Sequence, residues 1–235
     1  MLKTFIPLLF AFVSSYSTAS QDFAECRQFF PGGVIPVVDS QQSMEARALC
    51  FSSFAILHSG KSKTPIYVVQ KLNKETLIDA GNNQRTNQFF PDARLPRAER
   101  AELVDYRESG FDRGHMAPAG DMTTSEGMAQ SFSLANMVPQ APINNRKAWA
   151  GIEKATRKYV LRAQGDVFVM TGPVFDSNPE KIGPGQVWIP KYLFKLVYDP
   201  NTQRSWAHWL ENIDEARPSK PISAEELLSR TGIHF

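Results

Sequence analysis

Short apolar segments of strand length, separated by turn-forming residues, run through most of this 235-residue chain. Such segments are typical of β-strands, because strand side chains alternate between two faces while Gly, Pro, Asn and Asp favour the turns between strands. The predicted strands cover residues 55–58, 65–72, 166–171, 192–198 and 204–210. The last two flank Asp199-Pro200-Asn201-Thr202, which predicts an antiparallel hairpin.

Helical patterns are fewer. The clearest covers residues 145–164, with Asn144 as the predicted N-cap and Gly165 just past the end. Ser223 and Glu226 form a capping-box pattern that predicts a short C-terminal helix. Strands therefore outnumber helices, and tight βαβ alternation is missing. This predicts an α+β fold with a central antiparallel or mixed sheet flanked by helices.

The chain shows no repeat, low-complexity segment or linker, so residues 20–235 are expected to form one domain. Residues 82–105 are polar and contain Pro91 and Pro96, which predicts a long surface loop.

The first 19 residues have the pattern of a cleaved signal peptide. Lys3 precedes an apolar run at 5–13, and Ser17-Thr18-Ala19 fits a small-residue cleavage site. The run is far shorter than the roughly 20 residues that span a bilayer. We therefore expect export to the periplasm or beyond, with no membrane span in the mature protein. A buried N-terminal helix is the alternative.

The two cysteines, Cys26 and Cys50, match neither a CxxC redox motif nor a four-ligand zinc pattern. In an oxidising compartment we expect them to pair as a disulfide. Two buried free thiols are the alternative, which a thiol assay on the native protein would distinguish.

Histidine is scarce, and only one of the four stands among other candidate site residues. His58, His208 and His234 have the surroundings of structural side chains. His115 instead follows Asp112-Arg113-Gly114 without the apolar run that would bury this group as core. About 20 residues later, an amide-rich stretch at 134–145 leads into a tryptophan and a glutamate. Taken alone, these amides also fit turn and cap chemistry.

Several motifs, in this order, resemble the DNA/RNA non-specific endonuclease family, the ββα-metal nucleases with an Asp-Arg-Gly-His motif. The family includes mitochondrial endonuclease G and secreted bacterial nucleases. The matching segments are DRGHMAPAGD at 112–121, LANMVPQ at 134–140, the spacing of Asn145, Trp149 and Glu153, RTNQFFPD at 85–92, VMTGPVF at 169–175 and IPKYLFKLV at 189–197. The resemblance covers nearly all of residues 20–235 and implies a ββα-metal active-site motif within the fold.

The resemblance also implies a role for each matching residue. His115 corresponds to the general base, Asn145 to the metal ligand, and Glu153 to the glutamate that binds the metal through water. Asn136 corresponds to an active-site asparagine, and Arg85 to the arginine that contacts the scissile phosphate. The implied reaction is hydrolysis of DNA and RNA that leaves 5′-phosphate and 3′-hydroxyl ends.

Elementary chemistry agrees with these assignments. A neutral imidazole can take a proton from water, and a nucleophile made from water does not need the 2′-hydroxyl of RNA. A site with one asparagine ligand and no Cys or His cluster suits hydrated Mg²⁺, so Mn²⁺ is expected to substitute and Zn²⁺ to perform poorly. In a regular α-helix Asn145 and Glu153 lie about 12 Å apart along the axis and about 80° apart around it. Direct ligation of one ion by both is therefore not expected.

Positive charge must be concentrated locally to bind a polyanion, because the net charge is only +2. The predicted helix 145–164 carries six basic residues and one acid, and Arg113, Arg146 and Lys147 are the predicted nucleic-acid contacts. Arginines at 94, 97, 100 and 107 are further candidates, although four interleaved acids fit a solvated surface of mixed charge equally well.

Two other functions fit part of the pattern. One is a noncatalytic envelope protein that binds nucleic acid, and the other is a phosphodiesterase for small nucleotides or phospholipids. No protein partner is evident from the sequence.

Overall fold

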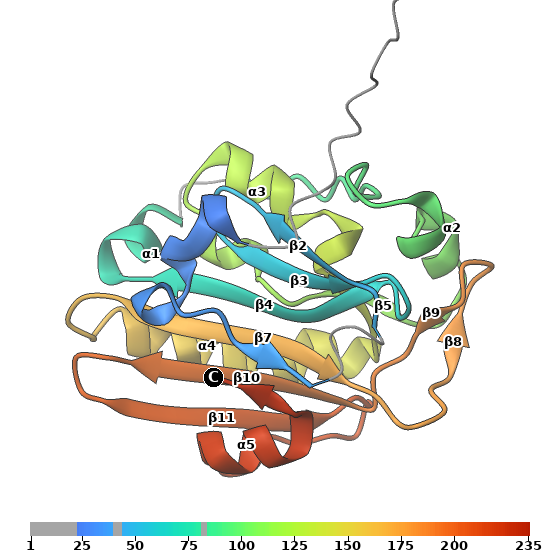
Figure 1. The fold of residues 1–235 in the computed structure, drawn as a ribbon. Coiled ribbons are helices and arrows are strands. Elements are labelled where there is room, and N and C mark those ends of the chain that lie inside the picture. The colour runs from blue at the N-terminus through green and yellow to red at the C-terminus, as the bar shows by residue number, and fades with distance from the viewer. Residues whose placement is uncertain (1–22, 40–43, 81–83) are drawn as a thin grey trace, which may run out of the picture.

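The computed structural model describes residues 23–39, 44–80 and 84–235, so the predicted signal peptide at 1–19 lies outside the described residues. The centre of the fold is a six-stranded antiparallel sheet with the order β11-β10-β7-β4-β3-β2 (Figure 1). Its strands are β2 (Ala46–Cys50), β3 (Ala55–Ser59), β4 (Thr64–Leu72), β7 (Val167–Val174), β10 (Tyr192–Asp199) and β11 (Arg204–Glu211). The predicted α+β class and the β10–β11 hairpin are confirmed.

Smaller elements surround this sheet. Three two-stranded pairs are β1 (Val37–Val38) with β12 (Ile233–His234), β5 (Asp112–His115) with β6 (Met137–Gln140), and β8 (Lys181–Ile182) with β9 (Val187–Trp188). The α-helices are α1 (Lys74–Ala80), α2 (Leu103–Tyr106), α3 (Ser125–Ser131), α4 (Ala150–Val160) and α5 (Ala224–Thr231). Single 3₁₀ turns are η1 (Ala24–Phe29), η2 (Pro31–Gly33), η3 (Arg97–Glu99), η4 (Ala119–Asp121) and η5 (Leu134–Asn136). The 3₁₀ turn η3 and the helix α2 interrupt the loop predicted at 82–105.

The predicted helix 145–164 differs from the structure at its start. The chain is already helical at Pro142 and passes through a π-helical turn, η6 (Asn144–Trp149), before α4. The predicted N-cap role of Asn144 is therefore wrong. Its buried side chain donates to the carbonyls of Glu211 (2.7 Å) and Ile213 (3.2 Å) instead. The carboxylate of Asp214, distant in sequence, accepts from the backbone N–H of Ile143 at 2.7 Å and satisfies the helix start.

The C-terminal helix α5 begins as predicted. The hydroxyl of Ser223 accepts a hydrogen bond from the backbone N–H of Glu226 at 3.1 Å. The helix ends at Gly232, whose φ of 64° lies in the left-handed region that glycine adopts without strain.

The two faces of the sheet are covered by different parts of the chain. The face that we call the α4 face packs on α3 and α4, with Ile56, Val68 and Leu193 against Trp149 and Ile152. The opposite face, the α5 face, packs on η1 and α5 (Figure 1). Its buried side chains include Phe23, Phe30, Met170, Phe194 and Leu227.

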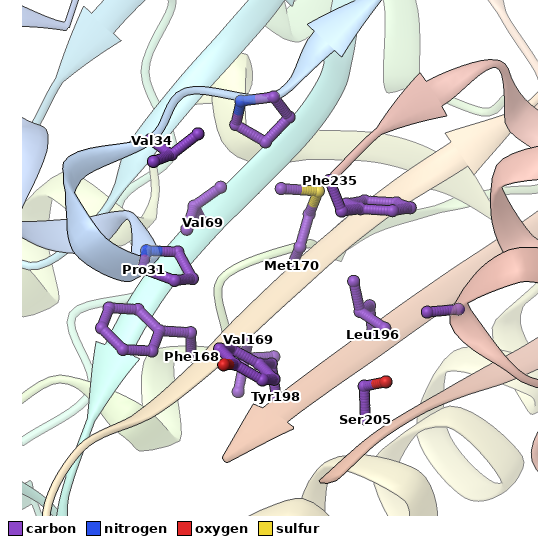
Figure 2. Close-up of a pocket in the computed structure, with 12 residues that line it drawn as sticks. Pro31, Val34, Val69, Phe168, Val169, Met170, Leu196, Tyr198, Ser205 and Phe235 are labelled. Atoms are coloured by element: carbon purple, nitrogen blue, oxygen red, sulfur yellow. The ribbon is translucent and has the colours of Figure 1, made fainter. Parts of the chain in front are cut away.

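An apolar hollow of about 390 Å³ also opens on the α5 face. Val69, Met170, Leu196 and Phe235 are among its lining residues (Figure 2). Apart from the phenol of Tyr198, its lining side chains carry no titratable group.

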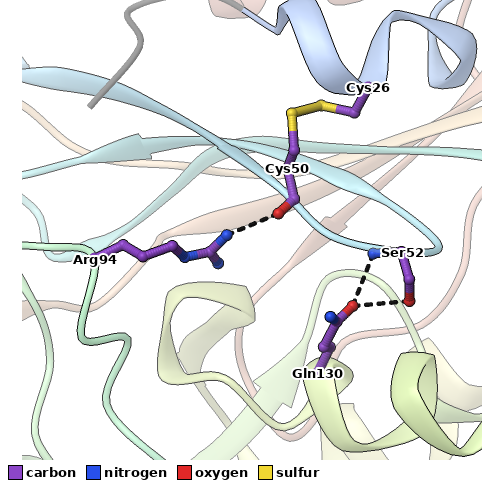
Figure 3. The surroundings of a disulfide bond; sticks show 5 residues. All are labelled: Cys26, Cys50, Ser52, Arg94 and Gln130. Carbon is purple, nitrogen blue, oxygen red and sulfur yellow. Dashed lines mark hydrogen bonds between the residues drawn. A yellow bond between two sulfur atoms is a disulfide. The ribbon is translucent and has the colours of Figure 1, made fainter. Parts of the chain in front are cut away.

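A disulfide joins Cys26 of η1 to Cys50 at the end of β2, with their Cα atoms 5.6 Å apart, and confirms the predicted pairing. Arg94 donates to the Cys50 carbonyl at 2.7 Å and so attaches the 84–102 segment to the same place (Figure 3). Among the described helices, none is both long and apolar enough to cross a membrane.

Candidate active site

The candidate site is built on the β5–β6 pair and the helix that follows it. His115, the last residue of β5, pairs with Met137, and Asp112 pairs with Gln140. The strands approach so closely that a Cβ at Gly114 would lie 2.1 Å from Oε1 of Gln140. Glycine is therefore required between Arg113 and His115, which explains the third position of the Asp-Arg-Gly-His motif.

A relay of side-chain amides fixes the helix against this pair. Gln140 donates through Nε2 to Oδ1 of Asn144 at 2.9 Å, and Asn144 in turn donates to the end of β11. The amide-rich stretch thus orients the first turn of the helix relative to β5.

His115 is 8% exposed, and its ring contacts two aromatic rings. The centroid of Phe132 lies 5.0 Å away in an edge-to-face arrangement, and that of Phe89 lies 5.8 Å away. Within the described part of the chain, the buried Nε2 atom has no hydrogen-bond partner. Such an atom costs free energy unless a ligand or water satisfies it, so it is a candidate position for a small polar group.

Burial, and then the nearby Arg85 cation, lower the pKa of His115 to about 3. The imidazole is therefore neutral at physiological pH, with the lone pair of one ring nitrogen unprotonated.

Arg85 lies beside this histidine, as the motif order predicted. Its guanidinium carbon is 5.1 Å from the centroid of Phe132, the same ring that His115 contacts. The side chain is exposed, and its Nε donates to Oδ1 of Asn87 at 2.6 Å. On the other flank, Arg113 stacks over Phe89 at 4.3 Å. Arg85 and Arg113 thus lie over the two aromatic rings that contact the imidazole, and no ion pair of His115 occurs among the described residues.

The side chain of Asn136 does not lie where it could face a substrate. Its side chain is fully buried, accepts from the N–H of Ala117, and donates to the carbonyls of Ala117 and Ser131, each at 2.9 Å. These three hydrogen bonds hold the segment that follows His115. The side chain therefore fixes the backbone that follows the histidine and does not face solvent.

Asn145 is oriented by a carboxylate. Its Nδ2 donates to Oδ2 of Asp112 at 2.9 Å, which leaves the carbonyl oxygen as the atom available to a ligand. Asp112 also forms a two-point ion pair with Arg146, at 2.6 and 2.9 Å. Arg146, predicted to bind nucleic acid, thus has a partner already, whereas Lys147 is exposed and appears in no ion pair of the described residues.

The π-helical turn changes the relation between Asn145 and Glu153. The N–H of Ala150 bonds to the carbonyl of Asn145, five residues back, which widens this turn by about one residue. Positions seven apart share a face in a regular α-helix, so one added residue brings positions eight apart onto a shared face. The 80° offset expected from regular geometry is therefore wrong, while the separation of about two turns along the axis remains.

Glu153 is half-buried beside a set of buried charges. Burial raises its pKa to about 7, the Lys195 ammonium opposes this shift, and the Asp121 carboxylate adds to it. Arg157, one turn further along α4, pairs with Asp121 at 2.9 Å, and Lys195 donates to the Thr171 hydroxyl at 2.7 Å.

Sequence analysis gave no role to Asp121, Arg157 or Lys195. A signal for one of them was present, because a lysine inside the apolar run Leu193-Phe194-Lys195-Leu196-Val197 predicts a charge on a buried strand.

The further arginine candidates are largely engaged in structural pairs. Arg94 binds both oxygens of Asp92 and stacks on Phe51, and Arg100 pairs with Glu102 at 3.0 Å. These contacts favour the structural interpretation of that stretch over a phosphate path.

The site consists of two short antiparallel strands followed by a helix. The strands carry a buried imidazole, and one helix face carries an amide and a carboxylate. This is a ββα site of the kind expected from the motifs. The sequence profile of the DNA/RNA non-specific endonuclease family matches residues 32–232, and the chain belongs to this family.

Similar proteins include the mitochondrial Nuclease 1 of Schizosaccharomyces pombe, which is 32% identical over 69% of this chain and 54% of its own length. Bovine mitochondrial endonuclease G is 33% identical over 62% of this chain and 52% of its own, and a Nostoc nuclease is 34% identical over the same shares. The chain thus spans about half the length of these relatives. A crystal structure of the EndoG/EndoGI complex has a similar fold, with a TM-score of 0.72 and 24% identity over 80% of this chain and 84% of that one.

No cluster of three or more His, Cys, Asp or Glu side chains that could hold a metal occurs in residues 23–39, 44–80 and 84–235. The available donors are instead the Asn145 amide oxygen and the Glu153 carboxylate. A neutral oxygen donor with a nearby carboxylate fits a hard ion that keeps most of its water, and does not fit zinc, which favours nitrogen and sulfur.

Proposed function

We propose that this protein is an exported, metal-dependent endonuclease that hydrolyses phosphodiester bonds in both DNA and RNA without sequence preference. The observation that carries the proposal is the unpartnered Nε2 atom of His115 beside the Arg85 cation. A neutral base next to a positive charge suits the activation of water against a phosphate, because the cation binds the anion while the base takes the proton.

In the proposed reaction His115 removes a proton from the attacking water through Nε2. Arg85 offsets the negative charge that builds up on the phosphorus-bound oxygens. Asn136 acts as a positioning residue, since its hydrogen bonds fix the chain just after His115. Because water attacks phosphorus, and the 3′-oxygen departs and takes up a proton from water, hydrolysis leaves a 5′-phosphate and a 3′-hydroxyl.

Asn145 and Glu153 are the proposed holders of Mg²⁺, with Glu153 acting through water and Mn²⁺ able to replace Mg²⁺. When bound, the ion would stabilise charge on the phosphate and on the departing 3′-oxygen. Asp112 keeps the amide of Asn145 in one orientation, and the shared helix face directs Glu153 toward the same region.

Export to the periplasm or beyond is proposed on two grounds. The sequence at 1–19 has the pattern of a cleaved signal peptide, and the disulfide suits an oxidising compartment. N-terminal sequencing of the protein recovered from cells should find that the mature chain begins after residue 19. A chain that still begins at Met1 would contradict the proposal.

The central test is digestion of plasmid DNA and of RNA with Mg²⁺ or EDTA, by the wild type and by His115→Ala. We expect cleavage only with metal, and a fall in kcat of about 10²–10⁴ in the variant, as is typical when a general base is lost. His234→Ala is the matched control, because His234 is exposed and pairs with Asp39 near the C-terminus. Near-full activity of His115→Ala would refute the assignment.

The same assay separates the alternative functions. Binding of DNA without cleavage would indicate a noncatalytic protein. Faster turnover of a small chromogenic diester than of long duplex DNA would indicate a phosphodiesterase for small substrates.

A further inference from the structure

The basic residues of η6, α4 and the turn that closes α4 include two groups that face different directions. Lys154, Lys158 and Arg162 are exposed and follow each other at intervals of four, so they share one side of the helix. The buried residues Ile152, Thr156 and Val160 lie on the other side, against the sheet. We name Lys154, Lys158 and Arg162 the outer stripe.

The two groups differ in their acidic partners. Arg146 and Arg157, on the flank next to the site, are paired with Asp112 and Asp121. For the outer stripe, no salt bridge is found within the described ranges. The stripe therefore presents unneutralised positive charge to solvent.

The stripe begins beside the site and extends away from it. Lys154 follows Glu153 directly, and each step of four residues advances about 6 Å along the helix axis. Each strand of duplex DNA places a phosphate about every 3.4 Å along the duplex axis, so this advance is close to two phosphate steps along that axis. A strand that leaves the active site along α4 would bring successive phosphates past these side chains.

We propose that the outer stripe is a second nucleic-acid contact surface, which holds the part of a long substrate that extends beyond the scissile phosphate. The inference rests on the proposed function and deepens it. The stripe touches no reacting atom, so it strengthens binding of long substrates and leaves the chemical step unchanged. A membrane surface is disfavoured as the partner, because the apolar side of α4 is buried against the sheet and cannot insert into lipid.

The test compares two triple variants with the same loss of charge. The first is Lys154→Gln/Lys158→Gln/Arg162→Gln. The control is Lys61→Gln/Lys181→Gln/Lys220→Gln, which removes three exposed lysines at scattered positions. Steady-state cleavage is measured on plasmid DNA and on a small chromogenic diester that cannot extend beyond the site, after thermal unfolding has shown that both variants fold like the wild type.

We expect the stripe variant to raise KM for plasmid DNA about ten-fold at physiological salt, with kcat on plasmid and all parameters on the small diester unchanged. Binding to plasmid is measured in the His115→Ala background to prevent cleavage. For the stripe variant, the slope of the logarithm of the binding constant against the logarithm of salt concentration should be less steep by up to about three. The scattered variant should resemble the wild type in both assays.

Each other outcome has a distinct meaning. Equal effects of the two variants would attribute the result to net charge and overturn the proposal, as would equal effects on long and short substrates. Loss of binding to phosphatidylglycerol vesicles, with DNA binding retained, would also overturn it. Absence of cleavage by the wild type would refute the proposed function, while the binding measurement would still decide the role of the stripe.

Discussion

The two faces of the central sheet come from the same strands but carry different chemistry. On β10, Phe194 and Leu196 point to the α5 face, whereas Lys195 points to the α4 face. On β7, Met170 belongs to the first face and Thr171, paired with Lys195, to the second. One face is thus almost entirely apolar, while the other buries charged and polar groups directly behind the active site.

This difference indicates a division of labour. Apolar burial on the α5 face stabilises the fold at about 25 cal/mol per Å² of buried surface. Burial of Asp121, Lys195 and Glu153 costs desolvation free energy that their mutual attraction only partly recovers. Substitutions on the α5 face should therefore change stability, and substitutions near the site should change activity.

The largest expected effect is on the α4 side. Asn145→Ala removes the proposed amide ligand, so Mg²⁺-dependent cleavage should fall below detection while the fold persists. Titration of activity against Mg²⁺ measures this effect, with Asn201→Ala in the exposed β10–β11 turn as the control. An ordinary Mg²⁺ titration curve for Asn145→Ala would exclude the ligand role.

On the α5 face, Phe194→Ala should lower stability and leave the activity of the folded protein unchanged. The side chain is fully buried in an apolar cluster, so its truncation should lower the free energy of unfolding by about 3–5 kcal/mol. Urea unfolding gives the stability, and kcat measured well below the transition should match the wild type. A large loss of kcat in the folded variant would break the proposed division between the faces.

The disulfide provides a second test of the same face. Cys26→Ser/Cys50→Ser opens a loop closed over a sequence separation of 24 residues, which should reduce the free energy of unfolding by about 3 kcal/mol. Activity at low temperature should persist, since the bond lies on the α5 face. Urea unfolding of the double variant measures the loss, and an unchanged midpoint would show that the bond contributes little.

His58 on β3 should make a smaller, pH-dependent contribution to the free energy of unfolding. Burial lowers its pKa to about 4, and its Nε2 lies 2.9 Å from the Glu99 carbonyl. Below pH 6.5 the unfolded chain takes up a proton that the folded histidine does not, so stability falls as the pH drops from 6.5 toward 4. The loss attributable to this residue is at most about 3 kcal/mol.

Unfolding curves of the wild type and His58→Gln between pH 4 and 7 isolate that contribution, because other titrating groups cancel in the difference. His58→Gln should show the shallower decline toward acid pH. Parallel curves would show that His58 is not the group responsible.

Much of the fold follows from local patterns in the sequence. Five strands of the central sheet and the helices α4 and α5 had clear signals in their apolar runs, turn residues and caps, whereas α1, α2 and α3 were not predicted. β2 was missed because Ala46-Arg47-Ala48-Leu49-Cys50 has little strand preference of its own and depends on pairing with β3. The short strands β5 and β6 were missed because they contain Gly114 and Pro139, which are rare in regular strands.

The site could be located from its motifs, but its supporting contacts could not. The motif order placed His115, Arg85, Asn145 and Glu153 in one region. The helix start depends on Asp214, about 70 residues away in sequence, which no local pattern predicts. The buried partners Asp121 and Lys195 likewise approach Glu153 only through tertiary packing.

The widened turn at Asn144–Trp149 makes the site sensitive to length as well as to composition. Deleting one residue within this turn would restore regular winding and leave the glutamate seven positions after Asn145, on the same face. Deleting one residue of α4 between Trp149 and Glu153 would instead keep the widened turn and rotate everything downstream by about 100° relative to β5. The carboxylate of Glu153 would then leave its alignment with Asn145. The turn can therefore lose its extra residue, whereas the number of residues between it and Glu153 is fixed by the proposed geometry of the site.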